Sequence, residues 1–454
     1  MNVHFIAIGG AAMHNLAIAL HLKGYNVTGS DDEIFDPAKS RLAKYGLLPK
    51  EQGWHPERIT NDLDAIVLGM HARIDNPELL RAQELGLKIY SYPEYLYEQS
   101  KEKTRVVIGG SHGKTTTTAM ILHVLAHASI EADYMVGAQL EGFEVMVRLS
   151  ETAKVMVIEG DEYLTSPIDR RPKFHVYQPN IAVITGIEWD HVNVFPTFDI
   201  YKDQFAQFIN LIRPDGTLIY CADDAVVREV AEGNNRTDIE KLPYDVPEYE
   251  VVDGVTNLIT ADGLRTPLRV FGRHNLLNLT AARLVCRTLG VTDKMFDEAI
   301  STFGGASKRL ELVKKGDHCA VYKDFAHAPS KLRATINAMR EQYPDRRLVA
   351  CMELHTFSSL TQDFLKQYSH TMAEADVRMV YYSKHALQLK KLPDLDPDQV
   401  REAFGDNVEV FTDSNAMVAK LKDMQWLDAN LLMMSSGNFD GIDFNQLADE
   451  LITD

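Results

Sequence analysis

A glycine-rich loop between a predicted strand and a predicted helix places the strongest constraint on the fold of this chain. Residues 109–117 read Gly-Gly-Ser-His-Gly-Lys-Thr-Thr-Thr, after a short apolar run at 105–108 and before a helical pattern. Glycines let backbone N–H groups approach phosphate oxygens, and the positive end of the following helix dipole faces the same point. The segment therefore predicts a phosphate-binding loop for a nucleoside triphosphate within an α/β domain.

Two side chains at the end of this loop carry the expected chemistry. Lys114 can neutralise the transferring phosphate, and the Thr115 hydroxyl is placed to ligate Mg²⁺. The general loop spacing asks for a glycine at position 108, where this chain has isoleucine, so the loop is a compressed Gly-x-x-Gly-Lys-Thr form. The candidate nucleotide-binding residues of the loop are Gly110, Ser111, His112, Gly113, Lys114, Thr115 and Thr116.

Acidic residues follow two further predicted strands. The apolar run at 155–158 leads into Glu-Gly-Asp-Glu at 159–162, and the run at 181–185 leads into Glu-Trp-Asp-His at 188–191. Carboxylates and a histidine at neighbouring strand ends can hold Mg²⁺ beside nucleotide phosphates. Acidic loops are more often simply solvated. These two clusters predict a metal site because they follow a phosphate loop and lie at strand ends.

The chain divides into three predicted α/β segments. Its 454 residues give a prior of about three domains. A charged linker near 100–104 and a Gly-Gly-Ala-Ser linker at 304–307 set the expected boundaries, so the predicted domains are 1–103, 104–305 and 306–454. Alternating strand and helix patterns predict parallel sheets covered by helices. The polar stretch 232–241 is expected to be a surface insertion.

Composition limits the partners of the protein. With 47 Lys and Arg against 65 Asp and Glu, the net charge is −18, which argues against broad nucleic-acid binding. No apolar run reaches the ~18 residues of a membrane helix. The first ten residues lack a basic leader, and the four cysteines are widely spaced without a CxxC pair. We therefore expect a cytoplasmic protein with no nucleic-acid or membrane partner.

Several ordered motifs resemble the Mur ligase family, the ATP-dependent amide-forming enzymes of bacterial cell-wall precursor synthesis. They include the phosphate loop and the two acidic clusters, then Gly-Arg-His-Asn-Leu-Leu-Asn at 272–278, Lys-Arg-Leu-Glu at 308–311 and Asp-Phe-Ala-His-Ala-Pro at 324–329. The resemblance covers nearly the whole chain. It implies a Rossmann-like N-terminal domain for a UDP-sugar, a central P-loop ATPase domain and a Rossmann-like C-terminal domain for an incoming amine.

The resemblance also implies substrates. Val-Thr-Gly-Ser-Asp at 27–31 and Asp-Asn-Pro at 75–77 look like the branch that activates UDP-N-acetylmuramate with ATP and Mg²⁺. The amine is then either the tripeptide L-Ala-γ-D-Glu-meso-diaminopimelate, in peptidoglycan recycling, or L-alanine, in peptidoglycan synthesis. His355, within 352–356, looks like the L-alanine branch. Four segments look closer to the tripeptide branch, namely 169–174, 189–195, 309–311 and 434–441.

Family roles are carried over by matching position. The resemblance implies Lys114, Glu159, His191 and Arg309 as catalytic residues, with Thr115, Glu159 and His191 as metal ligands. A capped helix start is the alternative for the 272–278 motif, and a surface ion pair is the alternative for Arg309. The other residues expected on the ATP side are His274, Asn275, Asn278, Asp324 and His327.

The expected substrate contacts are Gly9, Gly10, Ser30, Asp31, Asn76, Arg170, Arg171 and His355. The first glycine turn has alanine or histidine at three of positions 11–14, where the family usually has further glycines, and those side chains would crowd a diphosphate. Phe205 lies roughly where some relatives carry a carbamylated lysine. The basic pair at 170–171 either attracts an anionic substrate or forms a solvated face. His355 either contacts substrate or is a satisfied core histidine.

Two other classes of function stay open. A nicotinamide oxidoreductase is suggested by the first strand–helix–strand unit and by Asp31, about 20 residues after the glycines. Its glycine fingerprint is incomplete, however, and such an enzyme needs no phosphate loop. A P-loop ATPase or nucleotide-binding scaffold without ligase activity is the second alternative. The expected oligomeric state is a monomer or a weak homodimer.

Overall fold

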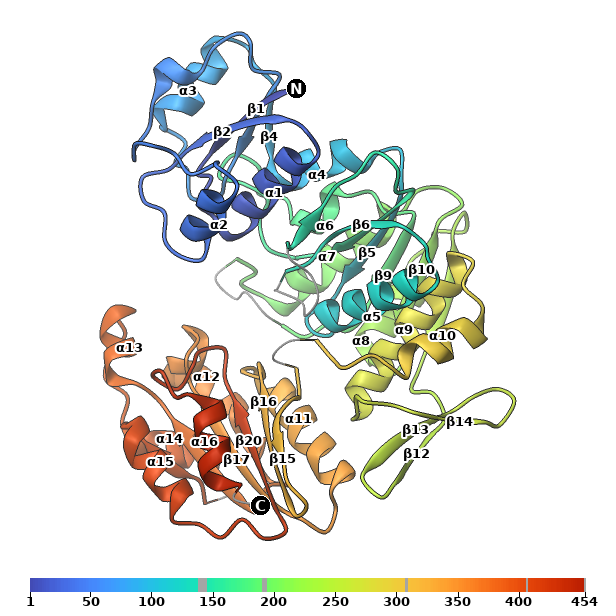
Figure 1. The fold of residues 1–454 in the computed structure, drawn as a ribbon, viewed down its shortest axis with the longest axis vertical. Helices are drawn as coiled ribbons and strands as arrows, with labels where there is room; N and C mark the ends of the chain where they lie inside the picture. The colour runs from blue at the N-terminus through green and yellow to red at the C-terminus, as the bar shows by residue number, and fades with distance from the viewer. Residues whose placement is uncertain (138–144, 190–193, 307–308, 406, 453–454) are drawn as a thin grey trace. The chain divides into compact units, whose positions relative to one another are not determined.

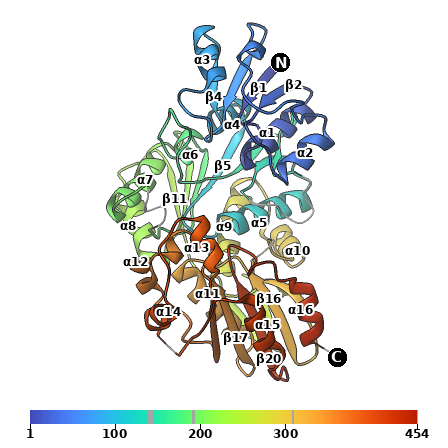
Figure 2. The same cartoon turned by 90° about the vertical axis from the view of Figure 1, so that its left-hand side faces the viewer.

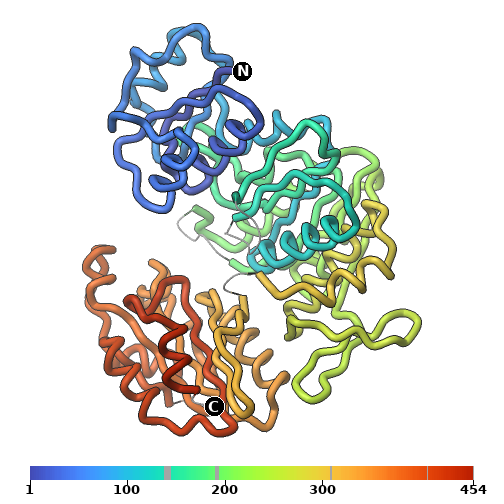
Figure 3. The backbone as a smooth tube through the Cα atoms, in the orientation of Figure 1, coloured from blue at the N-terminus to red at the C-terminus, as the bar shows by residue number. Residues whose placement is uncertain are grey.

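The computed structural model describes residues 1–137, 145–189, 194–306, 309–405 and 407–452. They form two compact units, Met1–Val246 with Leu277–Ala299, and Pro247–Leu276 with Ile300–Asp454. The chain leaves the first unit before a small antiparallel sheet and returns along a long helix, as the backbone trace in Figure 3 shows. The predicted α/β class is confirmed by three mainly parallel sheets.

The first sheet is parallel and has the order β2-β1-β3-β4. The central strand β3 is apolar throughout and fully buried, whereas the edge strand β2 has exposed polar residues at Asn26 and Thr28. Asn76 caps α3, and a capping box between Ser91 and Glu94 starts α4. The elements are β1 (Asn2–Ile6), α1 (Ala11–Leu22), β2 (Asn26–Ser30), α2 (Ala38–Lys44), η1 (Pro56–Arg58), β3 (Ala65–Leu68), α3 (Pro77–Glu84), β4 (Ile89–Ser91) and α4 (Tyr92–Ser100).

The second sheet has the order β11-β10-β9-β5-β8-β6-β7, with β7 alone antiparallel to its neighbour. Helix α5 packs against β5 and β8 in Figure 1. The elements are β5 (Thr104–Gly109), α5 (Lys114–His127), β6 (Ala132–Met135), β7 (Val147–Arg148), β8 (Val155–Glu159), α6 (Lys173–Val176), β9 (Ile181–Ile184), α7 (Phe198–Asn210), β10 (Thr217–Cys221), α8 (Ala225–Gly233), β11 (Glu240–Tyr244), α9 (Arg273–Thr288) and α10 (Asp293–Ile300).

One sequence expectation about this sheet is wrong. The stretch 232–241 was expected as a surface insertion, but its end enters β11, which pairs in parallel with β10. The strand escaped notice because it is charged and carries Pro243, as edge strands often do.

A small antiparallel sheet belongs to the second unit. Its strands are β12 (Tyr249–Val252), β13 (Val255–Ile259) and β14 (Arg265–Pro267). The Thr256 hydroxyl donates to the Gln342 side chain at 2.8 Å, and the Gln342 amide donates to the Gly254 carbonyl at 2.6 Å. These contacts attach the small sheet to α11.

The C-terminal sheet has the order β15-β16-β20-β17-β18-β19, with β15 antiparallel. The elements are β15 (Glu311–Lys315), β16 (Cys319–Asp324), α11 (Pro329–Gln342), β17 (Arg347–Glu353), η2 (Ser358–Leu360), α12 (Gln362–Leu365), η3 (Lys366–Tyr368), β18 (Val377–Tyr381), α13 (Lys384–Leu389), α14 (Pro397–Phe404), β19 (Glu409–Phe411), α15 (Ser414–Lys422), β20 (Ala429–Met434) and α16 (Phe444–Leu451).

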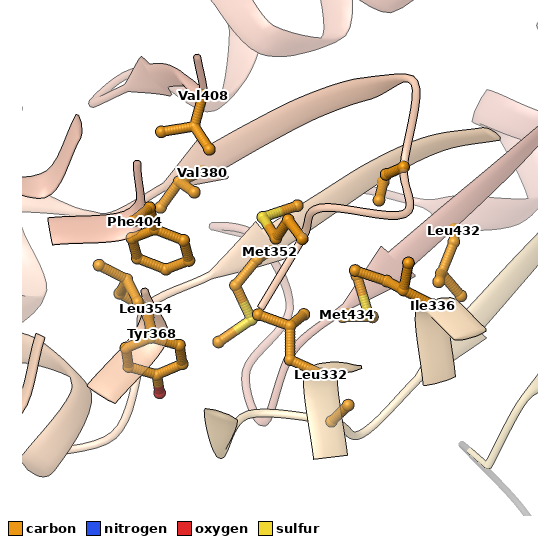
Figure 4. Close-up of a cluster of buried hydrophobic side chains, with 14 of the residues drawn as sticks. Leu332, Ile336, Met352, Leu354, Tyr368, Val380, Phe404, Val408, Leu432 and Met434 are labelled. Atoms are coloured by element: carbon orange, nitrogen blue, oxygen red, sulfur yellow. The ribbon is translucent and has the colours of Figure 1, made fainter. Parts of the chain in front are cut away.

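Two hydrophobic cores cover the two faces of this sheet. Leu432 and Met434 of β20 pack with Leu332 and Ile336 of α11, in the cluster that Figure 4 shows. The alternate residues Leu431 and Met433 pack on the other face, with side chains of α15 and α16. Figure 2 accordingly shows α11 and α16 on opposite sides of the sheet. Because both faces are buried, β20 ends in a continuous apolar run, Leu431–Met434, rather than an alternating pattern.

The four cysteines are buried and free. Among the helices of the described residues, none combines the length and the apolar character needed to cross a bilayer.

Arg105 on β5 links this strand to two neighbouring chain segments through buried hydrogen bonds. Its side chain is 1% exposed. Its guanidinium donates at 2.8 Å to the carbonyls of Ser100 and Tyr177, and at 3.0 Å to that of Gln178. One side chain thus satisfies carbonyls from two chain segments, a task for which its fixed fork of donors suits arginine.

Replacing Arg105 by leucine is expected to lower the free energy of unfolding by about 3 kcal/mol, since several buried carbonyls lose a charged donor. Urea denaturation followed by circular dichroism would measure the change. Arg148→Leu is the matched control, because it removes an exposed ion pair with Glu131 and one hydrogen bond to the Ala132 carbonyl, and it should alter stability by about 1 kcal/mol or less. Equal losses in the two variants would contradict this role of Arg105.

Candidate active site

The candidate site lies where three adjacent parallel strands end. Strands β9, β5 and β8 are neighbours in the second sheet, so the loops at their carboxyl ends meet at one edge. These loops are 185–189, 109–113 and 160–162. The predicted strand, loop and helix of the phosphate motif are present as β5, the loop and α5. The loop therefore sits at the helix N-terminus, where backbone N–H groups are available to an anion.

Two glycines of the loop leave no room for a side chain. Gly110 has φ +137°, and a Cβ there would stand 2.1 Å from the Thr185 hydroxyl oxygen. Gly113, at φ +78°, caps α5, and a Cβ there would stand 2.4 Å from Oδ1 of Asn278. Asn278, expected on the ATP side, thus packs directly against the loop. Both positions combine a left-handed backbone with close contact, which only glycine tolerates.

The loop is also held by the residues that follow β9. The Thr185 hydroxyl donates to the carbonyls of Gly109 and His112. The Ser111 amide donates to the Gly186 carbonyl at 2.9 Å, and the Glu188 amide donates to the Ser111 hydroxyl at 2.8 Å. These bonds fix the backbone of the loop before any ligand binds.

Lys114 lies among carboxylates. Its ammonium is 2.9 Å from Oε2 of Glu162 and also donates to the Gly110 carbonyl. Burial alone would lower the pKa of the Lys114 ammonium, but the charges of Glu162, Asp161 and Glu159 outweigh it and raise the pKa above its usual value. The lysine is therefore a fixed positive charge at the mouth of the loop.

Thr115 and Glu159 meet as the metal prediction requires. The Thr115 hydroxyl donates to Oε1 of Glu159 at 2.8 Å, and the Gly137 amide donates to Oε2 at 2.7 Å. A hydroxyl and a carboxylate are hard oxygen ligands, so their chemistry fits Mg²⁺. His191, expected as a further ligand, lies outside the described residues. Within the described ranges, no group of three His, Cys, Asp or Glu side chains is arranged to hold a metal ion.

In the second unit, Asp324 at the end of β16 holds the backbone at Leu310 and Ala326. Its carboxylate accepts from the amides of Leu310 and Ala326, each at 2.7 Å. Burial raises the pKa of Asp324, against the opposing effect of the Arg309 charge and of these hydrogen bonds. The Arg309 guanidinium lies 4.7 Å from the centroid of the Phe325 ring, a cation–π contact. Arg309 thus has an aromatic partner within its own unit.

Other residues expected on the ATP side make local contacts. The ring nitrogen Nδ1 of His327 is 2.8 Å from the Phe325 carbonyl oxygen. His274 and Asn275 open α9, and the Asn275 side-chain amide donates to the Phe271 carbonyl at 2.9 Å. This bond joins the first turn of α9 to the carbonyl four residues earlier, and a role for Asn275 on the ATP side stays a prediction.

His355 follows β17 at the carboxyl edge of the C-terminal sheet. Its Nδ1 is 3.5 Å from Oε1 of Glu353, and its side chain is 39% exposed. Glu353 is buried, with Oε2 accepting from the Ser435 hydroxyl and from the Phe439 amide. The imidazole is half-exposed and paired with a buried carboxylate, and its contact with substrate stays a prediction.

The expected substrate residues of the first sheet are largely engaged by the fold. The Gly9 amide donates to Oδ2 of Asp31 at 2.7 Å. Burial, followed by the neighbouring Asp32, raises the pKa of Asp31 to about 6. Ser30 is fully buried, and the Asn76 side chain accepts from two amides at the start of α3. Gly10 precedes α1 as its N-cap. Gly9 and Asp31 are therefore in direct contact, whereas the Asn76 side chain caps a helix.

The basic pair divides into two different environments. Arg171 pairs with Asp169 at 2.7 Å and with Glu94 at 3.6 Å. Arg170 is exposed and has no ion pair among the residues that the structure describes. Of the two, Arg170 is the one whose charge stays available to an anion.

Sequence reasoning missed Tyr201. This residue on the first turn of α7 is fully buried, and its hydroxyl lies 2.9 Å from Oγ of Ser111 and 3.1 Å from Oε1 of Glu162. A tyrosine among Phe195, Phe205 and Phe208 looks like a packing residue in the sequence. Only its position roughly ten residues after the second acidic cluster hinted at the site.

Family models match the chain in three consecutive stretches. The model described as "Mur ligase family, catalytic domain" matches residues 2–104, "Mur ligase middle domain" matches 108–286, and "Mur ligase, glutamate ligase domain" matches 308–437. Together they cover most of the chain in the order expected for a three-domain ligase of this type.

Individual relatives agree with the family models. The UDP-N-acetylmuramate–L-alanine ligase of Carboxydothermus hydrogenoformans is 30% identical over 410 residues, 88% of this chain and 85% of the relative. A solved UDP-N-acetylmuramate-alanine ligase from Thermotoga maritima has TM-score 0.68 and 21% identity, covering 97% of this chain and 96% of that one. A solved UDP-N-acetylmuramate:L-alanyl-gamma-D-glutamyl-meso-diaminopimelate ligase from Neisseria meningitides has TM-score 0.59 and 27% identity, covering 66% and 98%.

Gly110→Ala is expected to weaken ATP binding about tenfold or more, because the new methyl overlaps the Thr185 hydroxyl and displaces the loop. Isothermal titration calorimetry would measure the affinity. Gly24→Ala is the control, since Gly24 has φ +92° but open space around its Cβ position. It tests backbone strain without the clash and should leave ATP affinity unchanged; an equal loss there would refute the steric explanation.

Proposed function

The chain belongs to the Mur ligase family of ATP-dependent amide-forming ligases, and from this premise we propose that it joins UDP-N-acetylmuramate to a cell-wall peptide. The carboxylate of UDP-N-acetylmuramate is the acid, and the amine of L-Ala-γ-D-Glu-meso-diaminopimelate is the nucleophile. The observation that carries the proposal is the phosphate loop, with Lys114 beside Glu162 and Thr115 beside Glu159.

The proposed reaction has two chemical steps. The muramyl carboxylate oxygen attacks the γ-phosphorus of ATP, which forms an acyl phosphate and releases ADP. The amine then attacks the acyl carbon, the C–O bond to phosphate breaks, and the amine proton leaves to solvent or a base. Negative charge builds on transferring phosphoryl oxygens in the first step and on the departing phosphate in the second. A fixed cation is therefore needed throughout.

Lys114 is the residue of this chain that supplies that cation. Its ammonium stays protonated because three carboxylates raise its pKa, so the charge is in place before substrates arrive. The N–H groups at the start of α5 add a partial positive charge at the same point. Thr115 and Glu159 would hold Mg²⁺, with His191 as the further predicted ligand. When bound, Mg²⁺ would neutralise charge on the β- and γ-phosphates.

The remaining proposed contacts come from both units. Arg309 would pair with ATP phosphates, and the Phe325 ring beneath its guanidinium would keep it oriented. Asp324 fixes the adjoining backbone through Leu310 and Ala326. His274, Asn275, Asn278 and His327 are proposed to complete the nucleotide site. Gly9, Gly10, Ser30, Asp31 and Asn76 are proposed to line the UDP-sugar site.

The identity of the amine rests on two lines of support. The Neisseria structure, with a tripeptide in its description, is 27% identical to this chain, and segments 169–174 and 434–441 resemble that branch. L-Alanine is the second candidate, since relatives at 30–33% identity are described as L-alanine ligases and His355 matches that branch. Arg170, exposed and unpaired within the described ranges, would favour the more anionic tripeptide.

The proposal carries expectations about the setting of the enzyme. We propose a cytoplasmic enzyme that acts as a monomer or weak homodimer, in domains bounded near residues 103 and 305. Nucleic acid and membrane are not expected partners. Both nucleotide substrates are polyanions, whereas the chain carries −18, so their binding must depend on local lysine, arginine and bound Mg²⁺.

Amine-dependent phosphate release tests the proposal. The protein is incubated with ATP, Mg²⁺ and UDP-N-acetylmuramate, and then with L-alanine or the tripeptide in separate reactions. We expect rapid phosphate release and an amide product with the tripeptide. Release with L-alanine alone would make the second candidate correct. Phosphate release that never depends on an amine would sink the ligase proposal and leave an ATPase.

Lys114→Ala is expected to reduce turnover by about 10³-fold, because the transferring phosphate loses its fixed cation. Steady-state phosphate release with both substrates would measure the loss. Lys154→Ala serves as the control, since Lys154 is exposed next to the opposite end of β8 and should keep full activity. A Lys114→Ala enzyme that turns over at the control rate would overturn the assignment of the loop.

A further inference from the structure

The hydroxyl of Tyr201 connects the phosphate loop to the carboxylate that pairs with Lys114. It lies 2.9 Å from the Ser111 hydroxyl on the loop and donates to Oε1 of Glu162 at 3.1 Å. Oε2 of the same carboxylate is 2.9 Å from the Lys114 ammonium. All of these groups are in one unit and at most 16% exposed, so each interaction is made with little water nearby.

The tyrosine ring does not need its hydroxyl in order to pack. The ring makes edge contacts with Phe195 and Phe205, each with centroids 5.4 Å apart. A phenylalanine would keep both contacts. A buried hydroxyl is nevertheless expensive to leave without partners, and here its partners belong to the loop and to Glu162. The hydroxyl therefore serves the site rather than the core.

The two hydroxyls have two protons to share among three hydrogen-bond contacts, Ser111 with Glu188, Ser111 with Tyr201, and Tyr201 with Glu162. Ser111 can donate to the Glu188 carbonyl at 2.8 Å or to the Tyr201 oxygen, and Tyr201 can donate to Glu162 or to Ser111. When Ser111 donates to Tyr201, the Tyr201 proton is committed to Glu162. The two hydroxyls can thus direct a proton to Glu162 when its carboxylate loses the ion pair with Lys114.

Glu162 would lose this ion pair when a phosphate reaches the loop. Lys114 has to turn from Glu162 toward the phosphate, and Glu162, 1% exposed, then loses the ion pair with this lysine. A buried carboxylate without compensation is strongly unfavourable, and this penalty would be subtracted from the affinity for the nucleotide. A hydrogen bond donated to the carboxylate offsets part of it.

We propose that Tyr201 is a positioning residue of the phosphate site, whose hydroxyl holds Glu162 in place so that Lys114 can leave it for the phosphate of ATP. The proposal deepens the proposed function, on which it rests only insofar as the loop binds ATP. Tyr201 acts through Glu162 and Lys114 and is not itself a contact of the nucleotide.

Tyr201→Phe tests the proposal, with MgATP affinity measured by isothermal titration calorimetry in the absence of UDP-N-acetylmuramate and amine. We expect binding about tenfold weaker or more, the range for a hydrogen bond to a charged group. Tyr177→Phe is the matched control. Tyr177 is also fully buried in this unit, and its hydroxyl has no hydrogen-bond partner among the described residues. Its MgATP affinity should change less than twofold.

A double-mutant cycle separates positioning from packing. In a Glu162→Gln background the side chain carries no charge to compensate, so adding Tyr201→Phe should change MgATP affinity less than threefold. An equal loss in both backgrounds would mean that Tyr201 only supports the fold, and would overturn the proposal. So would unchanged affinity in Tyr201→Phe with an unaltered melting temperature.

These readouts keep the two proposals distinguishable. A wild-type protein that binds MgATP but never couples phosphate release to an amine refutes the ligase proposal and leaves the Tyr201 test intact. A wild-type protein that does not bind MgATP refutes both. Coupled turnover together with an additive cycle refutes the role of Tyr201 alone.

Discussion

A lysine ammonium held among three carboxylates is the interaction on which the candidate site depends. Lys114 would be costly to bury alone, and Glu159, Asp161 and Glu162 would repel one another without it. Lys114 offsets part of this negative charge, and Lys173, 2.5 Å from Oδ2 of Asp161, offsets more, so these charged groups can share one edge of a sheet. A phosphate that reaches the loop must also compete with these carboxylates for the Lys114 ammonium. Further polar groups such as Tyr201 and Ser111 can then stabilise the carboxylate that loses the lysine.

Strand order is what assembles these groups from distant parts of the sequence. Strand β5 lies between β8 and β9 in the sheet, so the loop after each strand opens at the same edge. The close approach of Thr185 and Asn278 to Gly110 and Gly113 then fixes the loop backbone. The same principle operates in the second unit, where Asp324 and Glu353 end β16 and β17 and Ser435 follows β20, the strand between them.

Features with a local physical signature were predictable from the sequence. The apolar runs form β5, β8 and β9, because strands buried on both faces are continuously apolar. The glycine-rich loop predicted the phosphate motif in the same way. Features that depend on tertiary contact were not. The charged strand β11 needed β10 to pair with, Asn76 proved to be a helix cap, and Tyr201 was indistinguishable from a core aromatic. The roles of the site residues remain proposals.

The two outer strands of the seven-stranded sheet have a consequence for self-association. Strand β11 carries Pro243, which has no N–H to donate, together with Glu240 and Lys241, and β7 is only two residues long. Neither edge presents a long row of unpaired backbone groups to another chain. Copies of this protein are thereby discouraged from joining strand to strand through this sheet, during folding as well as after it.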